Sequence, residues 1–164
     1  MKTVRRIAVA SRRVPQRRLL QNLELGVLHQ ARDTDVSEVL RRAGLRPTRQ
    51  RVALGRLLFA GDDRHVTAEM LHEEAVRVGQ RVSLATVYNT LHQFKRAGLL
   101  REIAVCGQRA YFDTNTSNHN HYFIEADGAL LDIPGTTVRV EGLPQPPDDM
   151  RIAHIDVVVR LIRK

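Results

Sequence analysis

The sequence predicts an α+β fold, with helices in its first half and short strands in its second half. Between residues 35 and 97, apolar residues recur at the three- and four-residue spacing of helices. From residue 99 onward, apolar and polar residues alternate in short stretches that suit strands. A polar Thr-Asn-Thr-Ser-Asn stretch at 114–118 separates two sets of strands, and it predicts a hinge between two domains.

Composition excludes several classes of protein. Of the 164 residues, 43% are hydrophobic, which is enough for a packed core and too much for a disordered chain. The single cysteine, Cys106, excludes an intramolecular disulfide framework and a zinc site built from several cysteines. The apolar runs are too short to cross a bilayer, and residues 1–18 lack the apolar stretch of a secretory signal. We therefore expect a reduced, cytoplasmic protein with no membrane contact.

Most of the net charge of +8 lies at the N-terminus. Residues 1–18 contain seven basic residues and no acidic residue, and we expect residues 1–34 to form a flexible basic extension. Arms of like charge are typical interaction tails; a transit peptide and a start codon assigned too early are the alternatives. An apolar stretch at 19–28 indicates a short helix within this extension.

Two helices are expected after the extension. Asp35 suits the N-cap of the first, with Glu38 three residues later to complete a capping box and Gly44 to end the helix. Pro47 suits the first turn of the second helix, which ends at Gly61. Their apolar faces consist of Val36, Val39 and Leu40, and of Val52, Leu54, Leu57 and Leu58.

Two further helices complete the first half. Thr67 suits the N-cap of the third helix, which Gly79 ends. Ser83 begins the fourth helix, which runs to Ala97. The residues expected to face the core are Met70, Leu71, Ala75 and Val78, and Leu84, Val87, Leu91 and Phe94.

Strands are predicted from residue 99 onward. Segments 99–105 and 108–113 form a hairpin around a Cys106-Gly107 turn. Helices followed by a hairpin are the element order of a winged helix, so residues 35–113 are predicted to form a winged-helix domain, followed by a hinge at 114–120. A small α/β domain is predicted at 121–164, with strands at 121–125, 129–133, 138–140 and 155–162 and a short helix at 148–153 after three prolines.

The fourth helix, preceded by the third helix and a short turn, has the layout of a helix-turn-helix. Its first turns present small and hydrogen-bonding side chains that suit close approach to base edges in the major groove. A basic stretch around the second helix suits contacts with DNA phosphates. The alternative interpretation is an ordinary solvated helix face. The candidate DNA contacts are Arg46, Arg49, Arg51, Arg56, Ser83, Ala85, Thr86, Tyr88 and Asn89.

Three motifs in this half resemble the ferric uptake regulator family. They are Ala-Gly-Leu-Arg-Pro-Thr-Arg-Gln-Arg at 43–51, His-Val-Thr-Ala-Glu at 65–69 and Ser-Leu-Ala-Thr-Val-Tyr-Asn-Thr-Leu at 83–91. The resemblance covers residues of about 38–133, and the stretches 110–115 and 155–161 are similar to the iron response regulators of alphaproteobacteria.

This resemblance implies a fold and a function. The expected protein is a transcription factor with an N-terminal winged-helix DNA-binding domain and a small C-terminal α/β dimerisation and sensing domain. It would bind a double-stranded DNA operator as a homodimer and regulate genes of iron or haem homeostasis. By position, Tyr88 and its neighbours would read the bases, and Arg46 would be the basic contact ahead of the second helix.

Histidines and aspartates near the hinge form a candidate metal site. His119 and His121 lie on the same side of an extended segment, Asp113 precedes them, Asp132 follows, and His65 lies in the loop before the third helix. Imidazole and carboxylate ligands suit Fe2+ or Mn2+, with Zn2+ as a further candidate. On spacing alone the alternative is polar surface sequence. The resemblance implies that these five residues are the regulatory ligands, and an ion held by both halves would fix the angle between them.

The sequence departs from the family at its cysteines. Many members hold a structural zinc with two Cys-x-x-Cys pairs, but Ile124 and Asp127 occupy the first pair's positions and the second pair is absent, so no four-cysteine zinc is expected. Haem is a candidate ligand, because iron response regulators respond to haem through a hinge histidine cluster; His119 and His121 are the candidates here. The three consecutive histidines of that cluster are replaced by His-Asn-His, and Cys106 lacks the proline of a Cys-Pro haem motif.

Two other functions remain open. With Asp113 and Asp132 as its carboxylates, the ligand set matches the peroxide-sensing branch of the family, in which bound iron oxidises a ligating histidine. Two histidines and a carboxylate also occur in non-haem Fe(II) oxygenases. The polar hinge and the aromatic content of only 4% argue against an enzyme, and none is expected.

Overall fold

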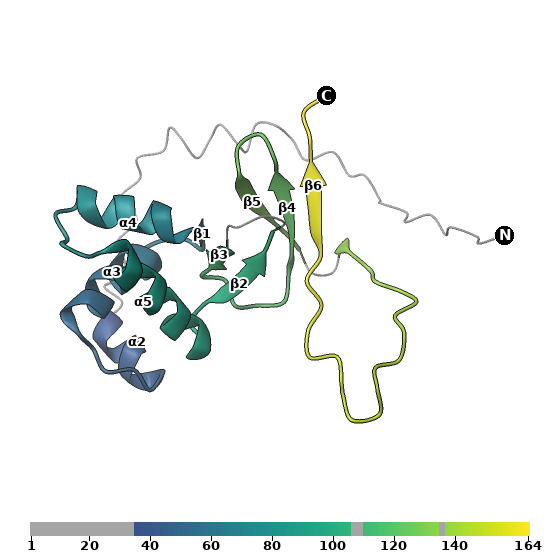
Figure 1. The fold of residues 1–164 in the computed structure, drawn as a ribbon, viewed down its shortest axis with the longest axis horizontal. Helices are drawn as coiled ribbons and strands as arrows, with labels where there is room; N and C mark the ends of the chain where they lie inside the picture. The colour runs from purple at the N-terminus through teal and green to yellow at the C-terminus, as the bar shows by residue number, and fades with distance from the viewer. Residues whose placement is uncertain (1–34, 106–109, 135–136) are drawn as a thin grey trace. The chain divides into compact units, whose positions relative to one another are not determined.

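The computed structural model describes residues 35–105, 110–134 and 137–164 (Figure 1). The predictions of a basic extension at 1–34, of a helix at 19–28 and of the Cys106-Gly107 turn lie outside these residues. Among the described helices, none is long and apolar enough to cross a membrane.

Four described helices each begin at a short polar side chain that accepts a backbone N–H two or three residues later. Asp35, Thr67 and Ser83 cap as predicted, because this hydrogen bond is purely local. The second helix was placed too early: its cap is Thr48, whose side chain accepts from the Arg51 N–H. The helices are α2 (Val36–Arg42), α3 (Arg49–Phe59), α4 (Ala68–Arg77) and α5 (Leu84–Arg96).

The capping box expected in α2 does not form. The Glu38 carboxylate pairs instead with Arg41 at 3.1 Å and Arg42 at 3.0 Å, on the exposed face of its own helix. These guanidinium groups lower the pKa of Glu38, with Arg42 the stronger influence. A charged partner one turn ahead competes successfully with the neutral backbone N–H of Asp35.

The helices bury one apolar core, in which Leu54, Leu71, Leu91 and Phe94 are almost fully inaccessible to solvent. Three residues expected to face the core are largely exposed: Met70 at 46%, Val78 at 54% and Leu84 at 37%. Met70 and Leu84 lie beside the buried stripes of their helices, and Val78 is the C-cap of α4. Helical spacing therefore located the stripes but overestimated their width.

The first sheet has the order β1-β3-β2, and the order of helices and strands is consistent with the predicted winged helix. Its strands are β1 (His65–Val66), β2 (Arg101–Ala104) and β3 (Ala110–Asp113). β1 and β2 each pair with β3 in the antiparallel direction. The two-residue strand β1 was predicted as a loop, because a segment this short shows no alternation and is defined only by its partner. Its pairing places His65 directly opposite Asp113.

The second sheet has the order β5-β4-β6. Its strands are β4 (Asn120–Ile124), β5 (Ala129–Ile133) and β6 (Val158–Leu161), with β6 parallel to β4. Residues 114–119 link β3 to β4 at the position predicted for the hinge; whether the domains divide there stays a prediction.

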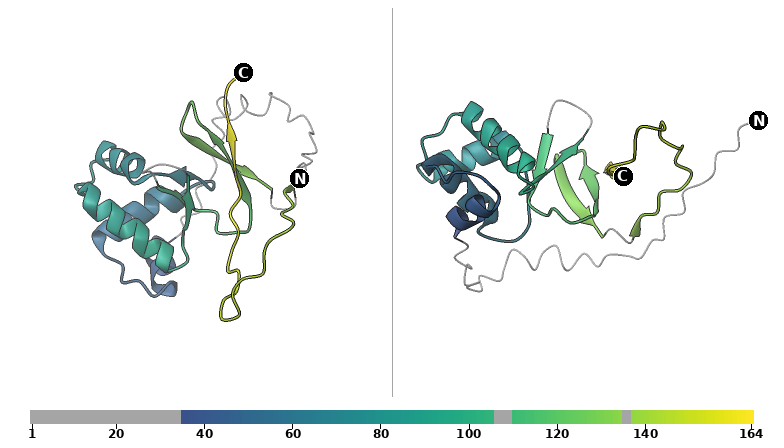
Figure 2. Two further views of the ribbon diagram at one scale, coloured as in Figure 1. Left: turned by 45° about the vertical axis from the view of Figure 1, so that its right-hand side comes forward. Right: turned by 90° about the horizontal axis from the view of Figure 1, so that it is seen from below.

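The connection from β5 to β6 corrects two predictions. Residues 138–140 form no strand and residues 148–153 form no helix. Almost every described residue of this connection is exposed, and no strand of the described chain pairs with residues 138–140 (Figures 1 and 2). Pro144, Pro146 and Pro147 lack backbone N–H groups, so the segment before residue 148 cannot extend a helix at 148–153 toward the N-terminus.

A small second core joins the two sheets. Ile103, Val105 and Tyr111 from the β2–β3 hairpin pack with Leu130 of β5, and Phe123 lies against them. The Tyr111 hydroxyl donates to the Gly128 carbonyl at 2.6 Å. This contact holds the end of β3 close to β4 and β5, where the polar cluster described next is located.

Candidate metal centre

The five predicted metal ligands come from strands of both sheets and the link between them. His65 on β1 is paired opposite Asp113 on β3, and His121 on β4 is paired opposite Asp132 on β5. His119 lies one residue before β4. Two cross-strand pairs and one flanking residue therefore supply the cluster, although the sequence separates its first and last members by 67 positions.

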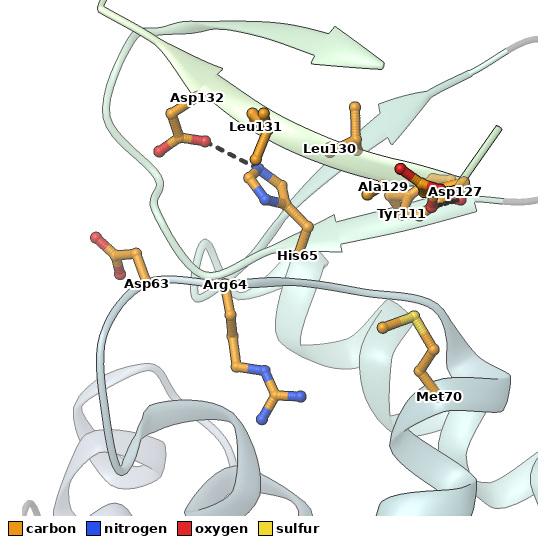
Figure 3. Close-up of a pocket in the computed structure, with 11 residues that line it drawn as sticks. Asp63, Arg64, His65, Met70, Tyr111, Asp127, Ala129, Leu130, Leu131 and Asp132 are labelled. Carbon is orange, nitrogen blue, oxygen red and sulfur yellow. Dashed lines mark hydrogen bonds and ion pairs between the residues drawn. The ribbon is translucent and has the colours of Figure 1, made fainter. Parts of the chain in front are cut away.

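The side chains of these residues converge. One ligand atom from each of the five lies within 4.8 Å of all the others. His119 Nε2 is 2.9 Å from Asp113 Oδ2, and His65 Nε2 is 3.0 Å from Asp132 Oδ1 (Figure 3). His121 Nε2 is 3.4 Å from Asp113 Oδ2. All five predicted residues are thus brought together.

Several buried polar atoms of this cluster have no hydrogen-bond partner among the described residues. They are His65 Nε2, His119 Nε2, Asp113 Oδ2 and both ring nitrogens of His121. The short distances between nitrogen and oxygen lack the alignment of hydrogen bonds, because the atoms point toward a shared space rather than along N–H···O lines. Unsatisfied buried polar atoms are costly, and a cation coordinated by them would remove that cost.

Burial sets the electrostatics of the cluster. The side chains of Asp113 and His121 are 0% exposed, whereas Asp132 is 38% exposed. Burial lowers the pKa of His65, outweighing the charges of Asp113 and Asp132, which raise it. Burial raises the pKa of Asp113, but the contact with His121, the Asn115 N–H and the other histidines lower it overall. Both shifts favour the forms that bind cations, a neutral imidazole and an ionised carboxylate.

The donor set fits a divalent transition metal. Three imidazoles and two carboxylates without a thiolate suit Fe2+, Mn2+ or Zn2+. The His119 Nδ1 lies 2.9 Å from the Ser117 carbonyl, so this nitrogen carries the proton and Nε2 keeps a lone pair for the cluster. Haem fits this arrangement poorly, since His119 and His121 are buried and their Nε2 atoms face carboxylates.

A pocket of about 470 Å³ lies beside the cluster. Figure 3 shows His65 and Asp132 at its upper side, with Met70 of α4 below. Asp132, whose side chain is 38% exposed, and His65 belong both to the cluster and to this pocket. Its lining consists of Asp63, Arg64, His65, Met70, Tyr111, Asp127 and residues 128–132.

The candidate DNA contacts on α5 lie near its N-terminus. Ser83, Ala85 and Asn89 are exposed, whereas Thr86 and Tyr88 are half-buried. The Tyr88 hydroxyl donates to Glu69 of α4 at 2.6 Å, and this bond raises the pKa of Tyr88. Tyr88 is therefore held in a defined orientation by the preceding helix.

The arginines around α3 divide into two kinds. Arg46, Arg49 and Arg56 are exposed, as phosphate contacts need to be. Arg51 is used within the protein, because its guanidinium donates to Gln93 of α5 at 2.9 Å and to the Arg46 carbonyl at 2.8 Å. It ties α3 to α5 rather than presenting a free charge.

Sequence reasoning missed the residues that support the cluster from outside. Asn115 donates to both carboxylates, and the Ser117 carbonyl accepts from His119 and Arg101. Residues 114–118 were recognised only as a polar hinge. The one available signal was the position of Asn115, two residues after Asp113, where a backbone N–H can reach an aspartate side chain.

Comparisons with known proteins agree with one another. The sequence model of the ferric uptake regulator family matches residues 42–141. The peroxide-responsive repressor PerR of Staphylococcus epidermidis is 34% identical over 116 residues, which cover 70% of this chain and 77% of the relative.

Solved structures extend the similarity to the fold. The ferric uptake regulator from Pseudomonas aeruginosa with manganese is 27% identical, with a TM-score of 0.60, over 79% of this chain and 98% of that one. The ferric uptake regulator (Fur) of Vibrio cholerae has a TM-score of 0.61 at 20% identity, over 77% of this chain and 98% of that one. The second similarity concerns the fold alone.

Proposed function

This chain belongs to the ferric uptake regulator family, and we propose that it is a transcriptional regulator that binds double-stranded operator DNA in response to a divalent metal ion. Members of the family are transcriptional regulators and not enzymes, so the oxygenase alternative is set aside. The observation that carries the proposal is the convergence of three histidines and two aspartates from two sheets within 4.8 Å.

The position of the ligands supports a mechanism. His65 and Asp113 belong to the sheet of the winged helix, whereas His121 and Asp132 belong to the second sheet. These residues would hold a divalent ion, whose positive charge would stabilise the arrangement in which all five ligands meet. Holding both sheets together in this way would set the position of α5 relative to the second sheet. The metal can change DNA affinity only to the extent that it binds one arrangement of the two sheets more tightly than the other.

Exposed residues of the described chain support the proposed sites for DNA and for a second copy. Exposed Arg46 and Arg49 and the N-terminal residues of α5 would meet phosphates and bases, respectively. Strand β6 is at the edge of the second sheet and exposes Val159 and Leu161, with Ile162 just beyond it. These features support a homodimer formed through this sheet.

The proposed signal is iron, with Fe2+ or Mn2+ at the five-ligand site. The iron response branch, predicted from residues 110–115 and 155–161, stays a prediction, and so does a response to haem. Ligation of haem by His119 or His121 would require the buried cluster to open, because both rings face Asp113. A direct response to the metal ion is therefore the version that the geometry supports best.

Peroxide sensing is the second candidate. Two observations favour it: both carboxylates are aspartates, and a relative 34% identical is a peroxide-responsive repressor. His65 and His119 both approach carboxylate oxygens within 3.0 Å, so an iron ion there would contact either ring.

One set of experiments distinguishes a direct response to the metal ion from a response to haem and from peroxide sensing. A duplex selected from a random library with the Mn2+-loaded full-length protein serves as the probe, and its affinity is measured without metal and with Mn2+, Fe2+ or haem. Tighter binding with the bare ions supports the proposal; binding that is indifferent to every ion contradicts it. Mass spectrometry after peroxide treatment then distinguishes the signals, since an added oxygen on His65 or His119 in the Fe2+ form, but not in the Mn2+ form, identifies peroxide sensing.

A further inference from the structure

In the link between Asp113 and His119, the backbone N–H and both side-chain polar atoms of Asn115 are hydrogen-bonded. The Asn115 backbone N–H donates to Asp113 Oδ1 at 2.8 Å, and its side-chain nitrogen donates to Asp132 Oδ2 at 3.3 Å. The Asn115 amide oxygen accepts from the Ser117 backbone N–H at 3.1 Å and from its hydroxyl at 2.6 Å.

These bonds define the orientation of the Asn115 amide. The backbone N–H of Ser117 can only donate, so the atom that faces it must be the amide oxygen. The amide nitrogen must then face Asp132, where it meets an oxygen that can only accept when the carboxylate is ionised.

Both aspartates divide their oxygens in the same way. Asp113 gives Oδ1 to Asn115 and directs Oδ2 toward His119 and His121. Asp132 gives Oδ2 to Asn115 and directs Oδ1 toward His65. In each carboxylate, the oxygen that faces the histidines is the one that Asn115 does not hold.

The same turn orients a third ligand. The Ser117 carbonyl accepts from His119 Nδ1 at 2.9 Å and from an Arg101 guanidinium nitrogen at 2.5 Å. Asn115 therefore belongs to a turn that contacts three of the five ligand side chains from outside the cluster, on elements of both sheets.

From this arrangement we infer that Asn115 is a positioning residue, which holds Asp113 and Asp132 so that each presents one oxygen to a metal ion. The inference rests on the proposed metal site and deepens it, because it explains how carboxylates from two sheets are aligned before an ion binds. Without the Asn115 amide, the half-exposed Asp132 is free to turn into solvent or to present both oxygens. Outer contacts of this kind typically contribute about 10–100-fold to metal affinity.

The test compares Asn115→Ala with Asn118→Ala, which removes an exposed asparagine of the same link. Asn115→Ala keeps the backbone bond to Asp113 and removes the side-chain bonds to Asp132 and to Ser117. It is expected to weaken Mn2+ binding by about 10–100-fold and to alter the visible absorption of bound Co2+, which reports coordination number. Asn118→Ala should match the wild type in both measurements.

A double-mutant cycle shows whether Asn115 acts through Asp132. In an Asp132→Ala background, Asn115→Ala should cause little further loss of Mn2+ affinity. An equal loss in both backgrounds, or wild-type affinity in Asn115→Ala, overturns the inference while leaving the metal site intact. A wild-type protein that binds neither Mn2+ nor Co2+ overturns the proposed function itself.

Folding of each variant is checked by circular dichroism without metal. If Asn115→Ala does not fold, Asn115→Ser provides the same comparison, since its hydroxyl is too short to replace the amide nitrogen at Asp132. A serine variant with wild-type Mn2+ affinity also overturns the inference.

Discussion

His65 Nε2 lies 3.0 Å from Asp132 Oδ1, although the two residues belong to different sheets and are 67 positions apart in the chain. His65 on β1 is fixed by its pairing with Asp113, and Asp132 on β5 by its pairing with His121. A direct contact between the first and second sheets therefore exists at the candidate metal centre, and an ion bound there would be held by both sheets.

Replacing Asp132 should weaken metal binding. Asp132→Ala removes the most exposed carboxylate of the cluster, and its loss of Mn2+ affinity should exceed the roughly 10–100-fold typical of an outer contact. In the wild type, Mn2+ at 100 times its Kd should stabilise the fold by about 2.7 kcal/mol, measured by chemical unfolding. Asp127→Asn is the matched control, since this aspartate lines the same pocket but pairs with Arg163. Equal Mn2+ affinity in the two variants would exclude Asp132 as a ligand.

The metal-free protein should lose stability as the pH falls below about 6.5. Burial lowers the pKa of His65 in the folded protein, whereas in the unfolded chain His65 takes up a proton near its ordinary value of 6.5. The unfolded state then binds more protons, so the free energy of unfolding falls with pH, by about 1.4 kcal/mol for each unit of pKa difference. Thermal midpoints between about pH 8 and pH 5 provide the measurement.

The matched variant for this pH dependence is His65→Gln. It lacks the titrating ring, so its thermal midpoint should fall less steeply over the same range. Asp113 affects stability in a lower pH range, because its pKa in the folded protein is below the ordinary value of 3.8. Its stabilising contribution is therefore present above pH 3.8 and is lost as the pH falls through the pKa of the folded state. Identical slopes for wild type and His65→Gln would contradict the role given to His65.

Arg101 should stabilise the contact between the wing and the chain before β6. Its side chain is 15% exposed, and its guanidinium donates to Asp156 at 2.7 Å and to the Ser117 carbonyl and lies 2.7 Å from His154 Nε2. Arg101→Ala should lower the free energy of unfolding by about 1–3 kcal/mol, since it also leaves acceptors unpaired.

Lys95→Ala is the comparison for Arg101. Lys95 pairs with Glu102 at 2.6 Å, but its side chain is 47% exposed, so its removal should cost less than about 1 kcal/mol. Urea unfolding of both variants measures the difference. Equal stabilities for Arg101→Ala and Lys95→Ala would show that the Arg101 contacts are unimportant.

Two arginines two residues apart should respond differently to replacement. Arg49 is exposed, and Arg49→Ala should reduce the salt dependence of DNA binding by about one unit of slope, with the preferred sequence unchanged. Arg51 ties α3 to Gln93 and to the Arg46 carbonyl, so Arg51→Ala should reduce the free energy of unfolding by about 1 kcal/mol. Anisotropy titrations at several salt concentrations, with urea unfolding of the same samples, separate the two. A stable Arg51→Ala with the salt slope of Arg49→Ala would reverse the assignment.

The predictable parts of this protein are those that depend on neighbours in the chain. Asp35, Thr67 and Ser83 could be identified as helix caps because their hydrogen bonds reach only two or three residues. Strand β5 was predicted with its observed limits, Ala129–Ile133, because its apolar pattern is bounded by a turn. The predicted strand at 138–140 was wrong for the opposite reason, since a suitable stretch forms no strand without a neighbouring strand.

The candidate site also has features that the sequence predicts and features that it does not. The types of ligand and their approximate positions could be inferred from the sequence, largely through the resemblance to a family. The pairing of His65 with Asp113 could not, because β1 has two residues and exists only beside β3. Nor could the role of Asn115, whose side chain meets an aspartate 17 positions later on another sheet.

By itself, the sequence determined three of the four described helix caps, the buried stripes of the helices and the kinds of atoms available to hold a metal. These properties follow from hydrogen bonds and periodicity within a few residues. Only the tertiary structure decided which atoms face one another: that five ligands meet, that Arg51 is engaged while Arg49 is free, and that Asn115 holds two carboxylates. Such contacts join residues distant in the chain, and their geometry is set by strand pairing and packing rather than by local preference.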